Sequence, residues 1–135
     1  MGKQVNRRNA EDALLSVSKA LPAADANNDT DSFDIGATGP HREGLKLRVD
    51  VPVNSVLVAD KTITLTLHDS ADNSSFAAVA DPGQTIEIVG ATGFPAGVYF
   101  FDIPAHARAY IRVNQAVLVG GGDNTGTSFT YSLVS

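Results

Sequence analysis

The sequence predicts an all-β fold: an antiparallel β-sandwich or jelly roll of about eight strands, preceded by an extended N-terminal arm. Two observations predict it. Apolar and polar residues alternate with a period of two in several segments after residue 31, and turn-forming clusters of Gly, Asn, Asp and Ser separate these segments. After Pro22 no segment repeats its apolar residues with a helical period, so a parallel α/β fold is not expected.

The composition is that of a chain with one folded domain. It has 135 residues, of which 43% are hydrophobic, and this suffices for a core of its own. We therefore expect residues 31–135 to form the jelly-roll domain. The chain has no cysteine, which excludes a disulfide framework and a thiolate metal site.

Charge and hydropathy exclude two classes of partner. The formal net charge of −5 argues against direct packing on nucleic acid, because phosphate contacts need clustered Lys and Arg. No stretch approaches the ~20 apolar residues of a membrane helix. The basic start over residues 1–10 is not followed by an apolar run long enough for a signal peptide, so we expect synthesis in the cytoplasm.

Residues 1–30 differ from the rest and are predicted to form an arm outside the core. The arm begins polar and basic, with Lys3, Arg7 and Arg8 ahead of the first acidic residue. An arm that becomes ordered on binding can cover a large area of a partner. We expect these three cations to meet acidic groups on such a partner.

A short helix could form over residues 10–21 within this arm. It would present Leu14, Leu15 and Val17, and Pro22 would end it because proline cannot continue a helix. These apolar residues are candidates to fill a groove between partner subunits. The alternative is an arm folded onto its own sandwich.

The first strong strand is predicted over residues 45–51, where Leu and Val alternate with Lys, Arg and Asp. The same alternation predicts strands around residues 62–67, 86–88 and 129–133. Weaker strands are expected at 32–35, 55–58, 98–103 and 110–118. The inward positions of these strands give the predicted core: Leu47, Val49, Ile63, Leu65, Ile88, Ile111, Val113, Phe129 and Tyr131.

No pattern in the sequence predicts catalysis, a cofactor or a metal. The three histidines, His41, His68 and His106, lie far apart beside predicted turns. The spacing of Asp25, Asn27, Asp29 and Asp31 begins like a calcium loop, but the required Gly and Glu positions hold other residues. We therefore expect a protein that is not an enzyme.

Arg108 and Arg112 flank Tyr110 at the start of a predicted strand. Two interpretations remain open. The arginines could pair with Asp102 or Glu87 on a solvent-facing surface. Alternatively they could lie at an interface with another protein, because Arg and Tyr are enriched at protein interfaces.

Two segments carry a resemblance to a known family. The first reads Leu-Thr-Leu-His-Asp-Ser-Ala-Asp-Asn-Ser-Ser-Phe over residues 65–76. The second comprises Phe-Asp-Ile-Pro at 101–104 and Ala-Arg-Ala-Tyr-Ile-Arg-Val at 107–113. Together with Phe-Thr-Tyr-Ser-Leu at 129–133, they resemble the capsid cement (decoration) proteins of tailed bacteriophages, over roughly residue 32 to the C-terminus.

The resemblance implies a jelly roll bound to the outer surface of a virion, where it bridges neighbouring major capsid subunits. A ligand that binds only the assembled shell stabilises it against internal DNA pressure by mass action. We also expect a homodimer or homotrimer, because closed symmetry is usual for such assemblies. The alternative function is a carbohydrate- or receptor-binding β-sandwich module, since fold does not determine function.

Overall fold

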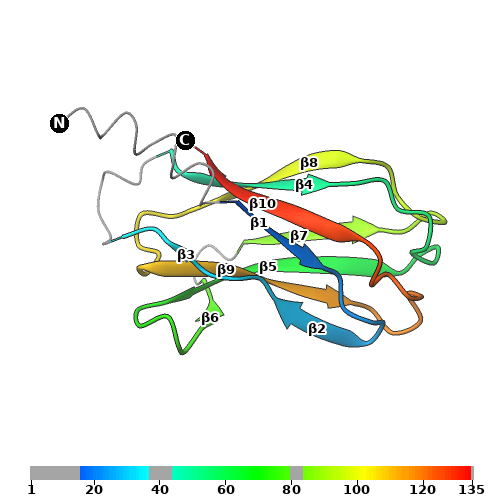
Figure 1. The fold of residues 1–135 in the computed structure, drawn as a ribbon, viewed down its shortest axis with the longest axis horizontal. Helices are drawn as coiled ribbons and strands as arrows, with labels where there is room; N and C mark the ends of the chain where they lie inside the picture. Colours follow the sequence, from blue (N-terminus) through cyan, green and yellow to red (C-terminus); the bar gives the residue numbers. More distant parts are fainter. Residues whose placement is uncertain (1–15, 37–43, 80–83, 135) are drawn as a thin grey trace.

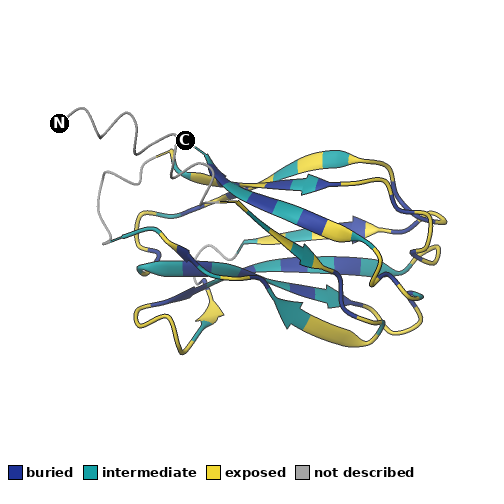
Figure 2. Cartoon of the chain, viewed as in Figure 1, coloured by how far each residue is buried: buried dark blue, intermediate teal, exposed yellow. Residues whose placement is uncertain are grey.

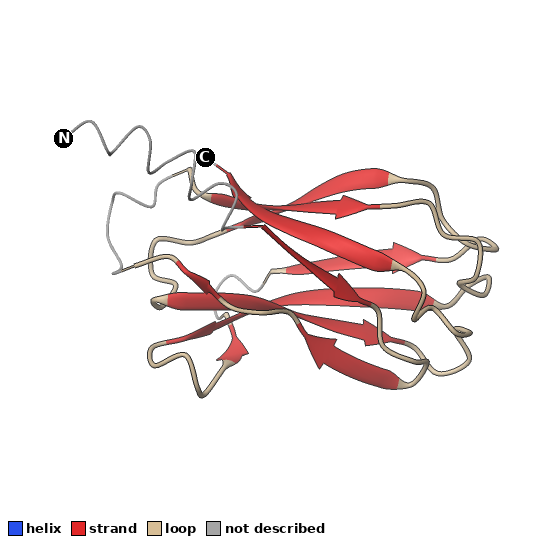
Figure 3. Cartoon of the chain, in the orientation of Figure 1, coloured by secondary structure: helices blue, strands red, loops and turns tan. Residues whose placement is uncertain are grey.

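The computed structural model describes residues 16–36, 44–79 and 84–134 of the chain. These residues form ten β-strands and no helix (Figure 3). The strands make two sheets that lie one above the other along the length of the molecule (Figure 1). The predicted antiparallel β-sandwich is confirmed.

The first sheet has four strands in the order β1-β10-β4-β8. In that order they are β1 (Ser16–Ala20), β10 (Ser128–Val134), β4 (Lys46–Val51) and β8 (Gly97–Asp102). Every neighbouring pair is antiparallel. β1 and β8 are therefore the two edges of this sheet.

The second sheet is built around β9 and β5, which share its longest pairing. β2 and the short β3 pair with β9, while β7 and the short β6 pair with β5. The strands are β2 (Ala26–Asp29), β3 (Phe33–Asp34), β5 (Thr62–Ser70), β6 (Ala77–Ala78), β7 (Thr85–Val89) and β9 (Tyr110–Val117).

The strand order identifies the sandwich as a jelly roll. The pairs β1–β10, β2–β9, β4–β8 and β5–β7 join strands progressively closer in the sequence, as in one long antiparallel ribbon. Rolling that ribbon brings β10 beside β4 and β9 beside β5, which gives the two observed sheets. Eight strands follow this plan, and β3 and β6 are short additions.

The core lies between the sheets, where the inward-facing residues of both meet (Figure 2). Buried and partly exposed residues alternate strictly along β9 and β10, as expected for strands with one solvent-facing side. The predicted core is confirmed, because none of its nine residues is more than 4% exposed. Phe94 and Phe129 add an edge-to-face ring contact with centroids 6.1 Å apart.

The arm prediction is wrong for residues 16–30. Ser16–Ala20 form strand β1 instead of a helix, and Ala26–Asp29 form strand β2 instead of a connector. Leu21 is only 1% exposed, and Val17 packs against the domain's own core. The physical reason is that β1 pairs with β10, so its partner lies at the other end of the chain. Residues 1–15 lie outside the described residues.

The predicted strand at 55–58 is also wrong, since this segment is a loop. The side-chain Oδ1 of Asn54 accepts hydrogen bonds from the backbone N–H groups of Val56 and Leu57, both at 2.8 Å. These two donors are therefore unavailable to a neighbouring strand. The apolar residues of the segment serve another purpose, described below.

Leu65 lies at the centre of β5 and is fully buried. Replacing it with Ala should lower the free energy of unfolding by ~2–5 kcal/mol, because the change removes buried methyl groups and leaves a cavity. Urea denaturation followed by circular dichroism measures this loss. A loss below ~0.5 kcal/mol, the size typical of surface substitutions, would contradict the central place of Leu65.

Candidate functional site

The two segments that carry the family resemblance meet in the structure through an ion pair between Asp69 and Arg108. Asp69 is buried near the end of β5, and Arg108 lies in the loop between β8 and β9. The Nη2 of Arg108 donates to Oδ1 of Asp69 at 2.8 Å, and its backbone N–H donates to Oδ2 at 3.0 Å. Nη2 also reaches the Asp69 carbonyl oxygen at 3.0 Å. Arg108 therefore holds the β8–β9 loop against the end of β5.

The environment of Asp69 has two opposing effects on its pKa. Burial raises the pKa, but the hydrogen bonds and the positive charge of Arg108, with a smaller effect of His106, outweigh burial and lower it overall. The Asp69 side chain is 9% exposed while that of Arg108 is 44% exposed. The pair is thus a structural contact that still presents a guanidinium edge to solvent.

Arg112 makes a second link between the same two segments. Its guanidinium carbon lies 4.0 Å from the centre of the Phe76 ring, in a cation–π arrangement. Its Nη2 also lies 3.4 Å from Oδ2 of Asp29 on β2. His68 is beside this group, and its pKa is lowered, mainly because burial disfavours the imidazolium and despite the opposing charge of Asp29.

The turn over residues 71–75 is held by Asp72. Its Oδ1 accepts hydrogen bonds from the hydroxyl of Ser70 and the backbone N–H groups of Ser74 and Ser75, at 2.8–3.0 Å. These bonds lower the pKa of Asp72 to about 2, with that to Ser75 the largest contribution. The turn therefore keeps a fixed shape and places Phe76 over Arg112.

The arginine partners differ from those predicted. Arg108 pairs with Asp69 and Arg112 with Asp29, whereas Asp102 pairs with Lys46 at 2.6 Å. We use the name motif cluster for the residues of these two ion pairs and of the Arg112–Phe76 contact, together with the nearby His68 and the half-buried Tyr110 at the start of β9: Asp29, His68, Asp69, Phe76, Arg108, Tyr110 and Arg112. Of the other predicted interface residues, Val17 lies in β1, while Lys3, Arg7, Arg8, Leu14 and Leu15 lie outside the described residues.

A second surface, which sequence reasoning missed, lies at the opposite end of the sandwich. The β4–β5, β7–β8 and β9–β10 loops gather there (Figure 1). Five large apolar side chains on two of these loops are 43–73% exposed, and we call them the apolar end: Val53, Val56, Val58, Leu118 and Val119. An exposed group of this kind commonly marks an interaction site. The Val-rich segment that suggested a strand at 55–58 was the available signal.

The apolar end rests on a hydrogen-bonded hub centred on Asn54, which is only 5% exposed. The Nδ2 of Asn54 donates to Oδ1 of Asn124 at 3.1 Å and to the hydroxyl of Thr127 at 2.8 Å. Its backbone exchanges two hydrogen bonds with Phe94, at 2.8 and 2.9 Å. Asn124 in turn donates to the Gly121 carbonyl at 3.1 Å. Three loops are thereby locked to one another.

Gly93 allows these loops to approach closely. It has a φ of +86°, and a Cβ at this position would lie 2.1 Å from the Asn54 carbonyl oxygen. Only glycine fits there, because a side chain would push the β7–β8 loop off Asn54. The apolar end is thus held by packed backbone as well as by side-chain amides.

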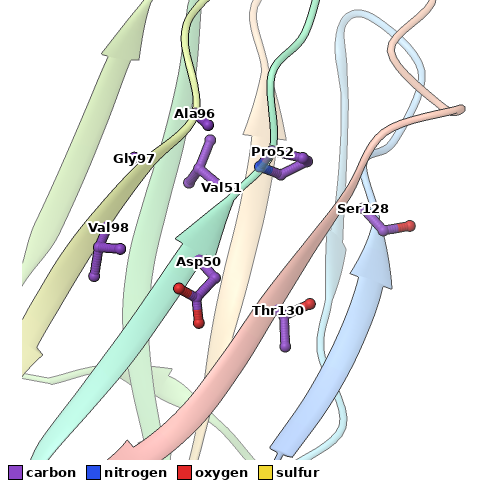
Figure 4. Close-up of a pocket in the computed structure, with 8 residues that line it drawn as sticks. All are labelled: Asp50, Val51, Pro52, Ala96, Gly97, Val98, Ser128 and Thr130. Carbon is purple, nitrogen blue, oxygen red and sulfur yellow. The ribbon is translucent and has the colours of Figure 1, made fainter.

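A hollow of about 480 Å³ opens beside the first sheet, next to the edge strand β8 (Figure 4). Its walls come from β4, β8 and β10 and from the residues just before β8: Asp50, Val51, Pro52, Ala96, Gly97, Val98, Ser128 and Thr130. Asp50 is the sole charged residue among them. This composition suits an apolar side chain better than a charged ligand.

Among the described residues, no group of three or more His, Asp or Glu side chains is placed to hold a metal ion. No helix in the described part of the chain is long and apolar enough to cross a membrane. The sequence matches no protein-family model, and a search of curated proteins finds no match.

The role of the hub can be tested with two substitutions, one at Asn54 and one at Thr127. Asn54→Ala should cost ~1–3 kcal/mol of folding free energy, because it leaves the N–H groups of Val56 and Leu57 without their acceptor. Thr127→Val removes only a hydroxyl that accepts from Nδ2 of Asn54 and leaves the Oδ1 acceptor in place, so it should cost less. Urea denaturation at pH 7 measures both. Equal losses for the two variants would contradict the acceptor role of Oδ1.

The Asp69–Arg108 pair predicts a pH dependence of stability. A carboxyl group with a lowered folded-state pKa stabilises the fold fully above its unfolded pKa of about 3.9, and this contribution disappears as the pH falls through the folded value. Between pH 6 and pH 3 the wild type should therefore lose more stability than Asp69→Asn. Urea midpoints at several pH values give the comparison. Parallel pH profiles for the two proteins would show that the pair contributes nothing.

Proposed function

We propose that the protein is a structural virion protein that binds the outer surface of a phage capsid and bridges major capsid subunits. The proposal rests on the resemblance of residues 65–76 and 101–113 to cement proteins and on the jelly-roll fold. The two resembling segments are joined by Arg108 and Arg112, so the motifs have a structural explanation and need no catalytic one.

The observation that best supports a binding role is the apolar end. Its five side chains stay exposed although the loops beneath them are fixed by Asn54, Asn124 and Gly93. A surface that is already ordered loses little conformational entropy on binding, which favours docking onto another folded protein. We therefore assign the contact with the major capsid protein to the apolar end. The basic residues Lys3, Arg7 and Arg8 stay part of the proposal as a second contact.

The alternative function, carbohydrate or receptor binding, is less well supported. Sugar-binding platforms commonly present exposed aromatic rings. Among the described aromatic residues, only Phe100 is exposed, and it lies on a strand edge away from the apolar end.

The charge of the whole chain is −5, which does not favour packing on nucleic acid inside a shell.

Capsid binding can be measured by cosedimentation with empty expanded capsids of the encoding phage. Val56→Asp and Val119→Asp should each weaken binding about tenfold or more, the equivalent of ~1.4 kcal/mol, because each places a charge in an apolar contact. Ala78→Asp on β6, an exposed apolar-to-acid change at the opposite end of the sandwich, is the matched control and should bind normally.

Two outcomes would overturn the proposal. If the wild type does not bind capsids but binds a defined sugar on a glycan array, the alternative function is correct. If Val56→Asp, Val119→Asp and Ala78→Asp all bind as tightly as the wild type, the apolar end is not the contact surface. Thermal melting of each variant shows whether the sandwich is intact.

A further inference from the structure

Strand β8 is an edge with its hydrogen-bonding groups open on one side. Within the described residues it pairs with β4 alone. The N–H of Ile103, just after β8, donates to the Leu45 carbonyl at 3.2 Å. In an antiparallel pair such bonds recur at every second residue, so Gly97, Tyr99 and Phe101 bond to β4. The N–H and C=O groups of Val98, Phe100 and Asp102 therefore point away from the sheet.

Except for Asp102 at its end, the outer face of this edge is apolar, unlike that of the other long edges. Val98 and Phe100 are 48% and 50% exposed. The edge strand β1 carries Ser16, Ser18 and Lys19, β2 is made mostly of Asn and Asp, and β7 has Glu87 at its centre. Proteins usually protect strand edges with such polar or charged residues, because an unprotected edge pairs with another chain.

We propose that β8 pairs antiparallel with β8 of a second copy of this chain, across a two-fold axis at Tyr99. Each Val98 then lies opposite Phe100 of the other copy, and these two residues exchange both backbone hydrogen bonds. The first sheets of the two copies become one continuous sheet. Because both copies use the same strand, the interface is closed and self-complementary.

The choice of axis follows from the side chains on the outer face. With the axis at Tyr99, both cross-strand neighbours on that face are valine–phenylalanine pairs, a favourable combination. An axis at Phe100 would place Val98 opposite the charged Asp102. An axis at Phe101 would place Phe100 opposite Asp102. An axis at Val98 would leave Phe100 opposite Ala96, beyond the strand. Among these axes, only the one at Tyr99 pairs both Val98 and Phe100 with large apolar residues inside β8.

The hollow beside β8 gives the partner's phenylalanine a place to lie. Val98 forms one of its walls, together with Val51 and Pro52 (Figure 4). The ring of Phe100 from the second copy, opposite Val98, would sit at the rim of this hollow. The strand pairing and the filling of the hollow therefore support each other.

One strand pair with four apolar side chains is a small interface compared with the ~1,600 Å² of stable complexes, so the dimer should dissociate on dilution. Attachment to a common surface would strengthen it by raising the effective concentration. The inference does not depend on the proposed function, since self-association is measured without capsids. A dimer that fails to bind capsids, or a monomer that binds them, would separate the two proposals.

Sedimentation velocity from ~1 μM to ~1 mM tests the association, a span that covers weak to moderate affinities. The wild type should shift from monomer to dimer, while Phe100→Lys should stay monomeric because it charges the edge. Ser18→Lys, on the opposite edge of the same sheet, is the matched control and should behave as the wild type does. A wild type that is monomeric throughout, or a Phe100→Lys variant that dimerises equally, would overturn the inference.

Engineered cysteines test the register, since the chain has none of its own. Residues in a hydrogen-bonded antiparallel pair have Cα atoms ~5.5 Å apart, within the range of a disulfide. A mixture of Val98→Cys and Phe100→Cys should therefore form crosslinked dimers faster than either variant alone. Ser16→Cys mixed with Ser18→Cys is the control and should not crosslink. Faster crosslinking of either single variant with itself would overturn the Tyr99 axis.

Discussion

The buried side chain of Gln115 joins the two sheets next to the turn between β1 and β2. It lies in the inward-facing row of β9, where its neighbours Ile111, Val113 and Val117 are apolar, and it is fully buried. Its Oε1 accepts a hydrogen bond from the hydroxyl of Tyr131 on β10. Its Nε2 donates to the carbonyl of Ala20 at 3.1 Å and to Oδ1 of Asn28 at 2.9 Å. One side chain thus connects both sheets and both N-terminal strands.

A buried amide of this kind fixes the register of β9 and also stabilises the fold. A shift of β9 by one residue would turn Gln115 to solvent and leave the Tyr131 hydroxyl buried without a partner, which is costly. Burial raises the pKa of Tyr131, so its hydroxyl stays protonated and remains a donor. β1 and β2 carry few large apolar residues, so hydrophobic burial stabilises their position only weakly. The hydrogen bonds from Gln115 to Ala20 and Asn28 add to that stabilisation.

The strands that the sequence predicted correctly are those whose own residues carry the signal. β4, β5, β9 and β10 alternate apolar and polar residues because one face is buried, and that pattern is local. β1 and β2 were missed because their partners, β10 and β9, lie about a hundred residues further along. Ala26–Asp29 has no large apolar residue and a poor β propensity, so only the pairing with β9 makes it a strand.

The same distinction applies to the candidate surfaces. The residue types at these positions predict Arg108, Tyr110 and Arg112 as interface candidates, but they do not predict Asp69 or Asp29 as partners of the arginines. Those contacts form only when the long strand ribbon rolls into the sandwich. Only residues 55–58 of the apolar end are predicted as a strand, in a segment where Val56 and Val58 alternate with other residues. What makes the segment a loop is one amide, on Asn54, which no periodicity reveals.

The two ends of the sandwich are held by different physical means, and this bears on how each could serve in binding. The motif cluster depends on ion pairs, whose exposed members weaken with salt and whose carboxylate Asp69 titrates at low pH. The apolar end depends on neutral amides, backbone bonds and a glycine, none of which titrates near neutral pH. A contact made through the apolar end would therefore keep its shape across ionic conditions, whereas one made through the arginines would compete with their own structural role. This difference supports the proposal that the apolar end is the surface that binds a capsid, while the motif cluster stabilises the fold.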